Sequence, residues 1–325
     1  MDRPVLGIDI SKGSFDVFLI QGEKQQHRSF PNQAEGFELL SNWLRECGLP
    51  QVHACMESTG RYGEELAQYL YEQEHQVSVV NPSRIRDYAR SKLIRNKTDK
   101  LDAKIIAIFC LNEKPALWQP PAPEIRELQA LVRHLEALQD MRTQENNRLK
   151  SGNPSKQVCS MLQEHLCFID QQIKQIKKRI KEHIDQHPGL KQDRDLLITI
   201  PGVGDSTAIK LLSENIQAFS DGRALAAFAG LNPSLCFSGT SVHHRGRLSK
   251  VGRSGLRKSL YFPAISAMRF NPQIRLFCER LEERHKPSMV IITAAMRKLL
   301  CLALGVLKSR LPFDPCYTQN ACALP

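Results

Sequence analysis

The order of apolar segments in the first quarter of the chain constrains the fold more than any other feature. Residues 5–10, 15–20 and 27–30 have the pattern of three strands in direct succession, with a turn-forming Ser-Lys-Gly-Ser between the first two. A helical period follows at 36–47, then a strand at 52–56, a helix at 62–71 and a strand at 77–80. This order predicts an antiparallel set of strands beside parallel ones, with helices packed on the sheet.

Two further helical segments, 83–93 and 101–111, follow the last strand. The complete order is that of an RNase H-like sheet, and we assign residues 1–118 to this domain. A linker with four prolines comes next: Pro115, Pro120, Pro121 and Pro123. The predicted fold class is therefore α/β before the linker and all-α after it.

Residues 119–190 are predicted to form a helical coiled-coil segment. In its second helix, apolar residues recur at alternating intervals of four and three, the spacing of a coiled-coil seam: Leu162, Leu166, Ile169, Ile173, Ile176 and Ile180. A break at 151–154 lets two helices fold back on each other or pair with another chain. The sequence does not decide between these two arrangements.

Residues 191–310 are predicted to form a mainly helical domain, and residues 311–325 a frayed tail. The apolar stretch 289–307 has Arg297 and Lys298 at its middle, where a membrane would disfavour charge. We therefore predict a buried helix there, and no membrane partner. Ten cysteines without a CxxC pair, and an N-terminus without an apolar leader, are typical of a reduced cytoplasmic protein without a zinc site.

The charge of the chain favours a polyanionic partner. The formal net charge is +11 and the pI is near 9.2, which suits nucleic acid or an anionic membrane surface. Residues 84–104 hold eight Lys or Arg against three acids, and Arg95 and Lys97 closely precede two aspartates. Cations beside carboxylates suit a phosphate backbone, although a solvated basic helix face would look the same.

Four acids form the strongest candidate site: Asp9, Glu57, Asp99 and Asp102. Asp9 and Glu57 lie at the ends of apolar strands, where the sites of α/β sheets collect. Asp99 and Asp102 are three apart at a helix start and share one face. Carboxylates brought together repel unless cations neutralise them, so the set predicts Mg²⁺ ligands. Taken singly, Asp99 fits a helix cap and Glu57 a surface acid, and alternation is expected to turn the weaker candidate, Asp16, outward.

The segment Ile-Pro-Gly-Val-Gly at 200–204 precedes a helical pattern. Its glycines, Gly202 and Gly204, would let backbone N–H groups approach a phosphate, as in a helix-hairpin-helix turn. A tight turn between two helices, with no ligand, is the alternative interpretation.

Residues 238–258, SGTSVHHRGRLSKVGRSGLRK, hold six cations and no acid. All six are predicted to contact nucleic acid: Arg245, Arg247, Lys250, Arg253, Arg257 and Lys258. A hydroxyl among them can donate a hydrogen bond to a phosphate or attack the phosphorus atom. Residue chemistry alone chooses neither the role nor the serine.

As a set, these motifs resemble the DEDD transposases of bacterial insertion sequences, the insertion-sequence one-hundred-ten family of bridge-RNA-guided recombinases. The matching stretches include GIDISKGSFDV, MESTGRY, VVNPSRIRDYARS, RNKTDKLDAK, IPGVG, LAAFAGL, SGTSVHHRG and LSKVGRSGLRKSLYFPA. They keep the family's order over nearly the whole chain, so the resemblance is far more specific than any one motif.

The resemblance implies a RuvC-like N-terminal domain in which the four acids are the DEDD residues and hold Mg²⁺, followed by a transposase domain with a catalytic serine. Ser238, in SGTS, matches the nucleophile and would link covalently to DNA, whereas Ser241 and Ser249 fit better as phosphate contacts. It further implies a structured noncoding guide RNA that pairs with donor and target DNA. Homo-oligomers, dimers or tetramers, would bring the acids of one subunit to the serine of another, in the bacterial cytoplasm at the nucleoid.

Three other functions compete with this one. A RuvC-like junction-resolving nuclease would use water as nucleophile and Ser238 only as a phosphate contact. An actin-like ATPase also begins with Gly-Ile-Asp before a hairpin, but it needs a later DxGG-type loop that this sequence lacks. A DNA or guide-RNA binder with a decayed site would bind without cleaving.

Overall fold

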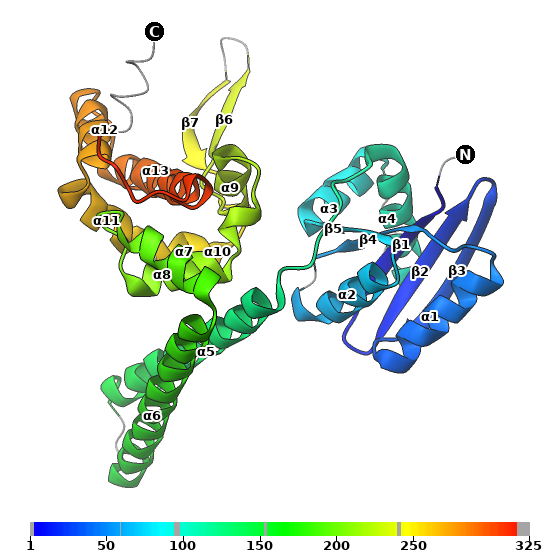
Figure 1. The fold of residues 1–325 in the computed structure, drawn as a ribbon, viewed down its shortest axis with the longest axis horizontal. Helices are drawn as coiled ribbons and strands as arrows, with labels where there is room; N and C mark the ends of the chain where they lie inside the picture. Colours follow the sequence, from blue (N-terminus) through cyan, green and yellow to red (C-terminus); the bar gives the residue numbers. More distant parts are fainter. Residues whose placement is uncertain (1–2, 59, 94–97, 153–154, 239–241, 317–325) are drawn as a thin grey trace. The chain divides into compact units, whose positions relative to one another are not determined.

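The computed structural model describes residues 3–58, 60–93, 98–152, 155–238 and 242–316; for residues 60–61, 235–238 and 242–246 it describes the backbone alone. Contacts within the chain separate two compact units, residues 1–120 and 121–325, whose elements Figure 1 shows. The separation falls in the proline linker, and the helical segment after it belongs to the second unit. A finer division at residues 190 and 310 stays a prediction.

The first unit contains a five-stranded sheet with the order β3-β2-β1-β4-β5. Its strands are β1 (Val5–Ile10), β2 (Ser14–Gln21), β3 (Lys24–Pro31), β4 (His53–Glu57) and β5 (Gln76–Val80). The β1–β2 and β2–β3 pairs are antiparallel, whereas β1–β4 and β4–β5 are parallel. The predicted RNase H-like arrangement is confirmed.

Helices cover both faces of this sheet (Figure 1). They are α1 (Ala34–Glu46), α2 (Glu64–Glu72), which follows the short helix η1 (Gly60–Gly63), α3 (Pro82–Ser91) and α4 (Asp99–Glu113). Alternate residues of β1 enter two different cores: Leu6 and Ile8 pack with α1 and α2, whereas Val5 packs with α3 and α4. Helices therefore cover both faces of this strand, and its alternation does not mark a solvent face.

Gly7 sets the distance between β1 and α4. A Cβ at this position would overlap the backbone oxygen of Ala103 and the backbone nitrogen of Ala107. Only a residue without a side chain lets the helix lie this close to the strand. The contact fixes the first turns of α4 near the carboxyl end of β1, where the next residue on the same face is Asp9.

The second unit begins with a helical hairpin, α5 (Pro123–Lys150) and α6 (Lys156–Gln186). The two helices pack on each other within the chain (Figure 1), and five of the six seam residues of α6 are buried, Leu166 being partly exposed. Other apolar side chains of the pair stay exposed: Met141, Met161 and Phe168. The structure thus shows the fold-back arrangement and leaves a second apolar surface on the hairpin.

The remaining helices are α7 (Pro188–Ile198), α8 (Asp205–Ser213), α9 (Gly222–Phe228), α10 (Ser254–Ser259), α11 (Tyr261–Phe270), α12 (Pro272–Glu283) and α13 (Ser288–Ser309), with a short helix η2 (Ile216–Ala218). They share one core with α5 and α6. A buried ammonium joins the two parts, because Lys210 on α8 lies 2.8 Å from Glu136 on α5 and 2.9 Å from Glu214.

A β-hairpin interrupts these helices. Its strands, β6 (Pro233–Ser238) and β7 (Val242–Leu248), pair antiparallel with an irregularity between Ser234 and Cys236. The sequence predicts helices and loops here, because both strands are short and their apolar residues do not alternate with polar ones.

Helix α13 is the one candidate membrane span among the described residues, by length and composition. Half of the apolar stretch of α13 is buried inside the unit. Residues such as Ala295, Leu299 and Ala303 are fully covered by neighbouring helices. The expectation of a buried helix is confirmed: α13 is the central helix of this core.

Replacement of Gly7 tests the close approach of α4. Gly7→Ala is expected to lower the free energy of unfolding by about 1–3 kcal/mol or more, because the added methyl must displace helix backbone. Urea unfolding followed by tryptophan fluorescence would measure this, since the two tryptophans, Trp43 and Trp118, both lie in the first unit. Gly13→Ala is the control, with nothing within 4 Å of its Cβ. If Gly7→Ala and Gly13→Ala lose the same free energy of unfolding, the packing argument is contradicted.

Candidate active site

The carboxyl end of β1 presents Asp9 on the face that α4 covers. Asp9 has the same parity along β1 as Val5 and Gly7, both of which face that helix. Its side chain is partly buried. The Asp9 carboxylate therefore lies between the sheet and the first turn of α4.

Glu57 lies beside Asp9 in the sheet. It is the last residue of β4, and the parallel register pairs Ile8 with Met56, so one further step brings Glu57 next to Asp9. Neighbours at the same register point to the same face. Cys55, two residues before Glu57, packs in the core under α4, which confirms that face.

The first turn of α4 supplies the other two acids. Thr98 caps the helix through a bond from the N–H of Leu101 to its hydroxyl oxygen, 3.2 Å long, so Asp99 is not needed as the cap. Asp99 and Asp102 both lie in this first turn, where the helix dipole favours negative charge.

The electrostatics of Asp9 indicate that other acids lie close enough to act on its charge. Burial, and then the charges of Asp102, Asp99 and Asp16, raise the pKa of Asp9 to about 6. A carboxyl group whose neighbours hinder its ionisation marks a site built for a cation or a proton. The structure therefore places the first turn of α4, with Asp99 and Asp102, at the end of β1 within electrostatic reach of Asp9, and Glu57 is adjacent through the sheet register.

The prediction that Asp16 turns outward is wrong. Asp16 is the direct cross-strand partner of Asp9, so both side chains lie on the α4 face and Asp16 does not turn away. Its carboxylate is already held by His27, 2.8 Å from Nε2, with a longer bond from the Ser29 hydroxyl. The strand pairing, which alternation alone could not give, adds this acid to the site.

The donor set fits a hard divalent cation in its chemistry. All the candidate groups are carboxylates, and a cation would relieve the repulsion that raises the pKa of Asp9. Among the residues that the structure describes, no three His, Cys, Asp or Glu side chains converge closely enough to hold a metal ion. The predicted phosphate contacts Arg95 and Lys97 lie outside the described residues.

The second unit carries the predicted nucleophile at the end of a strand. Ser238 is the last residue of β6, and its backbone pairs with Val242 at the start of β7. Ser238 therefore lies beside the hairpin turn, and the competing Ser241 falls outside the described residues. Arg245 lies within β7, of which the structure gives the backbone at that point.

A basic loop follows the hairpin and is fixed to α9. Gly252, at φ 139°, approaches so closely that a Cβ would overlap the backbone oxygen of Phe228, and the N–H of Arg253 donates to that same oxygen at 2.7 Å. This docking leaves the side chains of Lys250 and Arg253 exposed, and Arg247, near the end of β7, is exposed as well. A rigid loop with outward cations suits a phosphate backbone.

Arg257 and Lys258 on α10 differ in how far they are engaged. The Arg257 guanidinium donates to the carbonyl oxygens of Ala229, at 3.0 Å, and Lys250, at 3.4 Å. The Lys258 ammonium lies 3.7 Å from Asp140 in a pair that is exposed on both sides. Arg257 thus helps to fix the loop, and Lys258 is available to a ligand.

The glycine turn at 200–204 connects α7 and α8. Gly202, at φ 101°, packs against α11, where a Cβ would come within 2.6 Å of the Ala267 Cβ. This packing explains a glycine there without any ligand and supports the interpretation as a tight turn. Gly204 has no neighbour within 4 Å of a Cβ and is the N-cap of α8. A phosphate contact at either glycine stays a prediction.

Comparison with known proteins identifies the chain. A model of DEDD transposases of the IS110 type matches residues 6–152, and a model described as Transposase IS116/IS110/IS902 family matches residues 194–279. The pilin gene-inverting protein of Moraxella bovis is 34% identical over 97% of this chain and 98% of its own length. The chain belongs to the IS110 family of transposases.

Other similar proteins cover less of this transposase. An uncharacterized protein of insertion element IS110 from Streptomyces coelicolor is 26% identical over 46% of this chain and 36% of its own. Among solved structures, T. thermophilus RuvC in complex with a Holliday junction substrate matches 36% of this chain and 99% of that one, at 12% identity and a TM-score of 0.28. As a member of the family, the transposase is an enzyme of DNA recombination.

The raised pKa of Asp9 predicts a pH-dependent stability. The pKa is about 6 in the folded chain against an ordinary 3.8, so the ionised group destabilises the fold above pH 6, and this penalty is relieved as the pH falls from 6 toward 4. In metal-free protein, Asp9→Asn should therefore be more stable than the wild type at pH 8, by about 1–2 kcal/mol, and the difference should shrink at pH 5. Urea unfolding followed by tryptophan fluorescence, with a chelator present, measures both values.

The control for this experiment is Asp87→Asn. Asp87 lies on α3 in the same unit, and its side chain is exposed beside Arg90. We expect the same small effect of this change at both pH values. A stability difference for Asp9→Asn that does not vary with pH would contradict the electrostatic account.

Proposed function

We propose that the transposase cuts and rejoins DNA strands through a covalent link between Ser238 and DNA, at a site completed by the acids around Asp9. The observation that carries the proposal is the docking of α4 on β1, which places Asp99 and Asp102 at the strand end that carries Asp9, although they come from a distant part of the sequence. Membership of a transposase family and exposed cations on the loop after Ser238 support a DNA substrate.

The carboxylates Asp9, Glu57, Asp99 and Asp102 would hold Mg²⁺. Bound there, the ion would supply positive charge that stabilises a phosphate during strand exchange. The acids would position that charge between β1, β4 and the first turn of α4. Gly7 would keep this geometry constant, because it fixes the distance from α4 to β1.

The proposed strand cleavage is an exchange of phosphodiester bonds. The Ser238 oxygen forms a bond to phosphorus while a bond from phosphorus to a sugar oxygen breaks. The serine proton passes to a base, and the departing sugar oxygen takes up a proton. Attack by the hydroxyl of the exchanged strand reverses these steps and releases the serine. Each step replaces one phosphate ester with another, so no external energy source is required.

We further infer that a structured noncoding RNA guides the choice of donor and target DNA by base pairing. The protein would then grip backbones, which fits a basic chain and its exposed Arg247, Lys250 and Arg253. Similarity over the full length to a protein named for pilin gene inversion favours a reaction that can also invert DNA between two sites. The reaction would take place in the bacterial cytoplasm at the nucleoid.

A homo-oligomer, a dimer or a tetramer, would complete the active site. The acids lie in the first unit and Ser238 in the second, so the two groups of proposed catalytic residues belong to separate compact bodies. The apolar side chains that stay exposed on the α5–α6 hairpin, among them Met161 and Phe168, offer a surface for subunit contact.

Ser238→Ala is expected to abolish the covalent protein–DNA adduct and to lower strand cleavage by at least about a thousandfold, because the attacking oxygen is lost. Cleavage and adduct formation would be measured on denaturing gels with labelled donor and target DNA, the RNA encoded beside the gene and Mg²⁺. Ser249→Ala, in the loop after β7, is the matched control and should keep the adduct.

Cleavage retained by Ser238→Ala would overturn the serine mechanism and favour attack by water, as in a junction-resolving nuclease. Omission of the RNA tests guidance separately. If cleavage keeps its rate and its sites without RNA, base pairing with a guide does not choose the DNA.

Mixed subunits test the composite site. Asp102→Asn and Ser238→Ala should each be inactive alone, but a mixture should recover about a quarter of wild-type activity if the protein is a dimer with shared sites. In half of the random dimers, one site then has an intact serine and intact acids. A mixture of Asp9→Asn with Asp102→Asn, both in the first unit, should stay inactive. No recovery in the first mixture would place the acids and the serine of one site in the same chain.

A further inference from the structure

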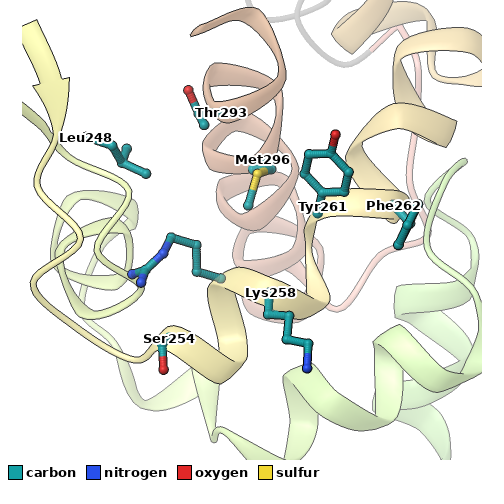
Figure 2. A pocket seen from close by; sticks show the side chains of 8 residues that line it. Leu248, Ser254, Lys258, Tyr261, Phe262, Thr293 and Met296 are labelled. Atoms are coloured by element: carbon teal, nitrogen blue, oxygen red, sulfur yellow. The ribbon is translucent and has the colours of Figure 1, made fainter. Parts of the chain in front are cut away.

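A pocket of about 400 Å³ opens between the base of the β6–β7 hairpin, α10, α11 and α13. Its lining residues, most of them labelled in Figure 2, are Leu248, Ser254, Arg257, Lys258, Tyr261, Phe262, Thr293 and Met296. The volume lies in the range of small-ligand sites, roughly 300–1,000 Å³. The predicted nucleic-acid contacts account for its two cations but not for its aromatic side or its shape.

An exposed aromatic ring forms one side of the pocket. Phe262, on α11, is 77% exposed, and among the described residues it is not one of those that pack in the core of this unit. Its ring meets Tyr261 edge to face, with centroids 5.3 Å apart. A single exposed apolar residue is ordinary. A ring held by a neighbouring aromatic beside a pocket offers a flat face for stacking.

The polar side of the pocket is cationic. Arg257 and Lys258 line it together with the hydroxyls of Ser254 and Thr293, and no acid is among the lining residues. Lys258 pairs with Asp140 only at 3.7 Å, in a contact exposed to solvent, and such pairs stabilise little. A phosphate can therefore take the place of that carboxylate at Lys258.

The position of the pocket relates it to the proposed nucleophile. Leu248, which lines the pocket, pairs with Pro233 at the base of the hairpin, whereas Ser238 lies at the other end of β6. Five residues of extended strand span about 17 Å. That length corresponds to about five stacked nucleotides at roughly 3.4 Å each.

We propose that this pocket binds one unstacked base of a nucleic-acid single strand a few nucleotides from the reacting phosphate, with the base stacked on Phe262 and an adjacent phosphate at Lys258. The inference rests on the proposed function, because it assumes that DNA and guide RNA pass the β6–β7 hairpin. It adds to that function a site that would hold a strand in register with Ser238. Stacking on an aromatic ring accepts any base, so the site positions the strand and does not read its sequence.

Binding of single-stranded oligonucleotides to the full-length protein tests the proposal. Labelled DNA and RNA strands of equal sequence, each intact or with one abasic position moved along it, would be titrated and followed by fluorescence anisotropy. The wild type should bind one abasic strand about tenfold more weakly than the intact strand, because the stacked base is missing. The kind of strand, DNA or RNA, that shows this loss identifies the source of the base.

Variants assign the loss to the ring. Phe262→Ala should bind intact and abasic strands with equal affinity. Phe262→Trp should still bind the abasic strand more weakly than the intact one. Phe270→Ala is the matched control, because Phe270 lies on the same helix, is 69% exposed and does not line the pocket. Lys258→Ala should lower the affinity for intact and abasic strands by the same factor and should reduce the salt dependence of Kd.

Two outcomes would overturn the stacking site and leave the proposed function standing. In the first, Phe262→Ala still binds the abasic strand more weakly than the intact one. In the second, the wild type binds nucleic acid but does not distinguish intact from abasic strands. A change of oligomeric state in Phe262→Ala with unchanged discrimination would show that the ring serves a subunit contact instead. A wild type that binds neither DNA nor RNA would overturn the proposed function together with the pocket.

Discussion

The close contact between Gly7 and α4 is the constraint on which the proposed catalytic site depends. Since a Cβ at Gly7 would overlap the backbone of α4, the helix can lie directly on β1 only with glycine there. That contact places the start of the helix, with Asp99 and Asp102, beside the end of the strand that carries Asp9. A bulkier residue at this position would move two of the four acids together.

The same constraint accounts for the unusual chemistry of Asp9. Its carboxyl group is partly buried and faces the charges of three other aspartates, and its pKa rises to about 6. A fold does not gather like charges for stability, because their repulsion opposes folding. The natural explanation is a ligand that neutralises them, and carboxylate oxygens select a hard divalent cation.

The second unit holds the basic loop after β7 in a fixed position against α9. The loop after β7 is held to α9 by a left-handed glycine, Gly252, and by bonds from Arg257 to two backbone carbonyls. With the backbone fixed, the neighbouring cations point outward, and a pocket with an exposed ring opens beside the hairpin. The acids and the serine of the proposed site thus lie in separate bodies, each ordered by its own core.

The sequence by itself determined the order of strands and helices in the first unit, the apolar seam of α6 and the acid candidates Asp9, Glu57, Asp99 and Asp102, because local periodicity and residue chemistry carry that information. It missed the β6–β7 hairpin, whose short strands have little periodicity, and it misplaced Asp16. Only the tertiary structure decided which face each acid occupies, because both faces of the sheet are covered and alternation alone cannot distinguish them. Strand register and helix docking, which depend on contacts between distant residues, settled that choice.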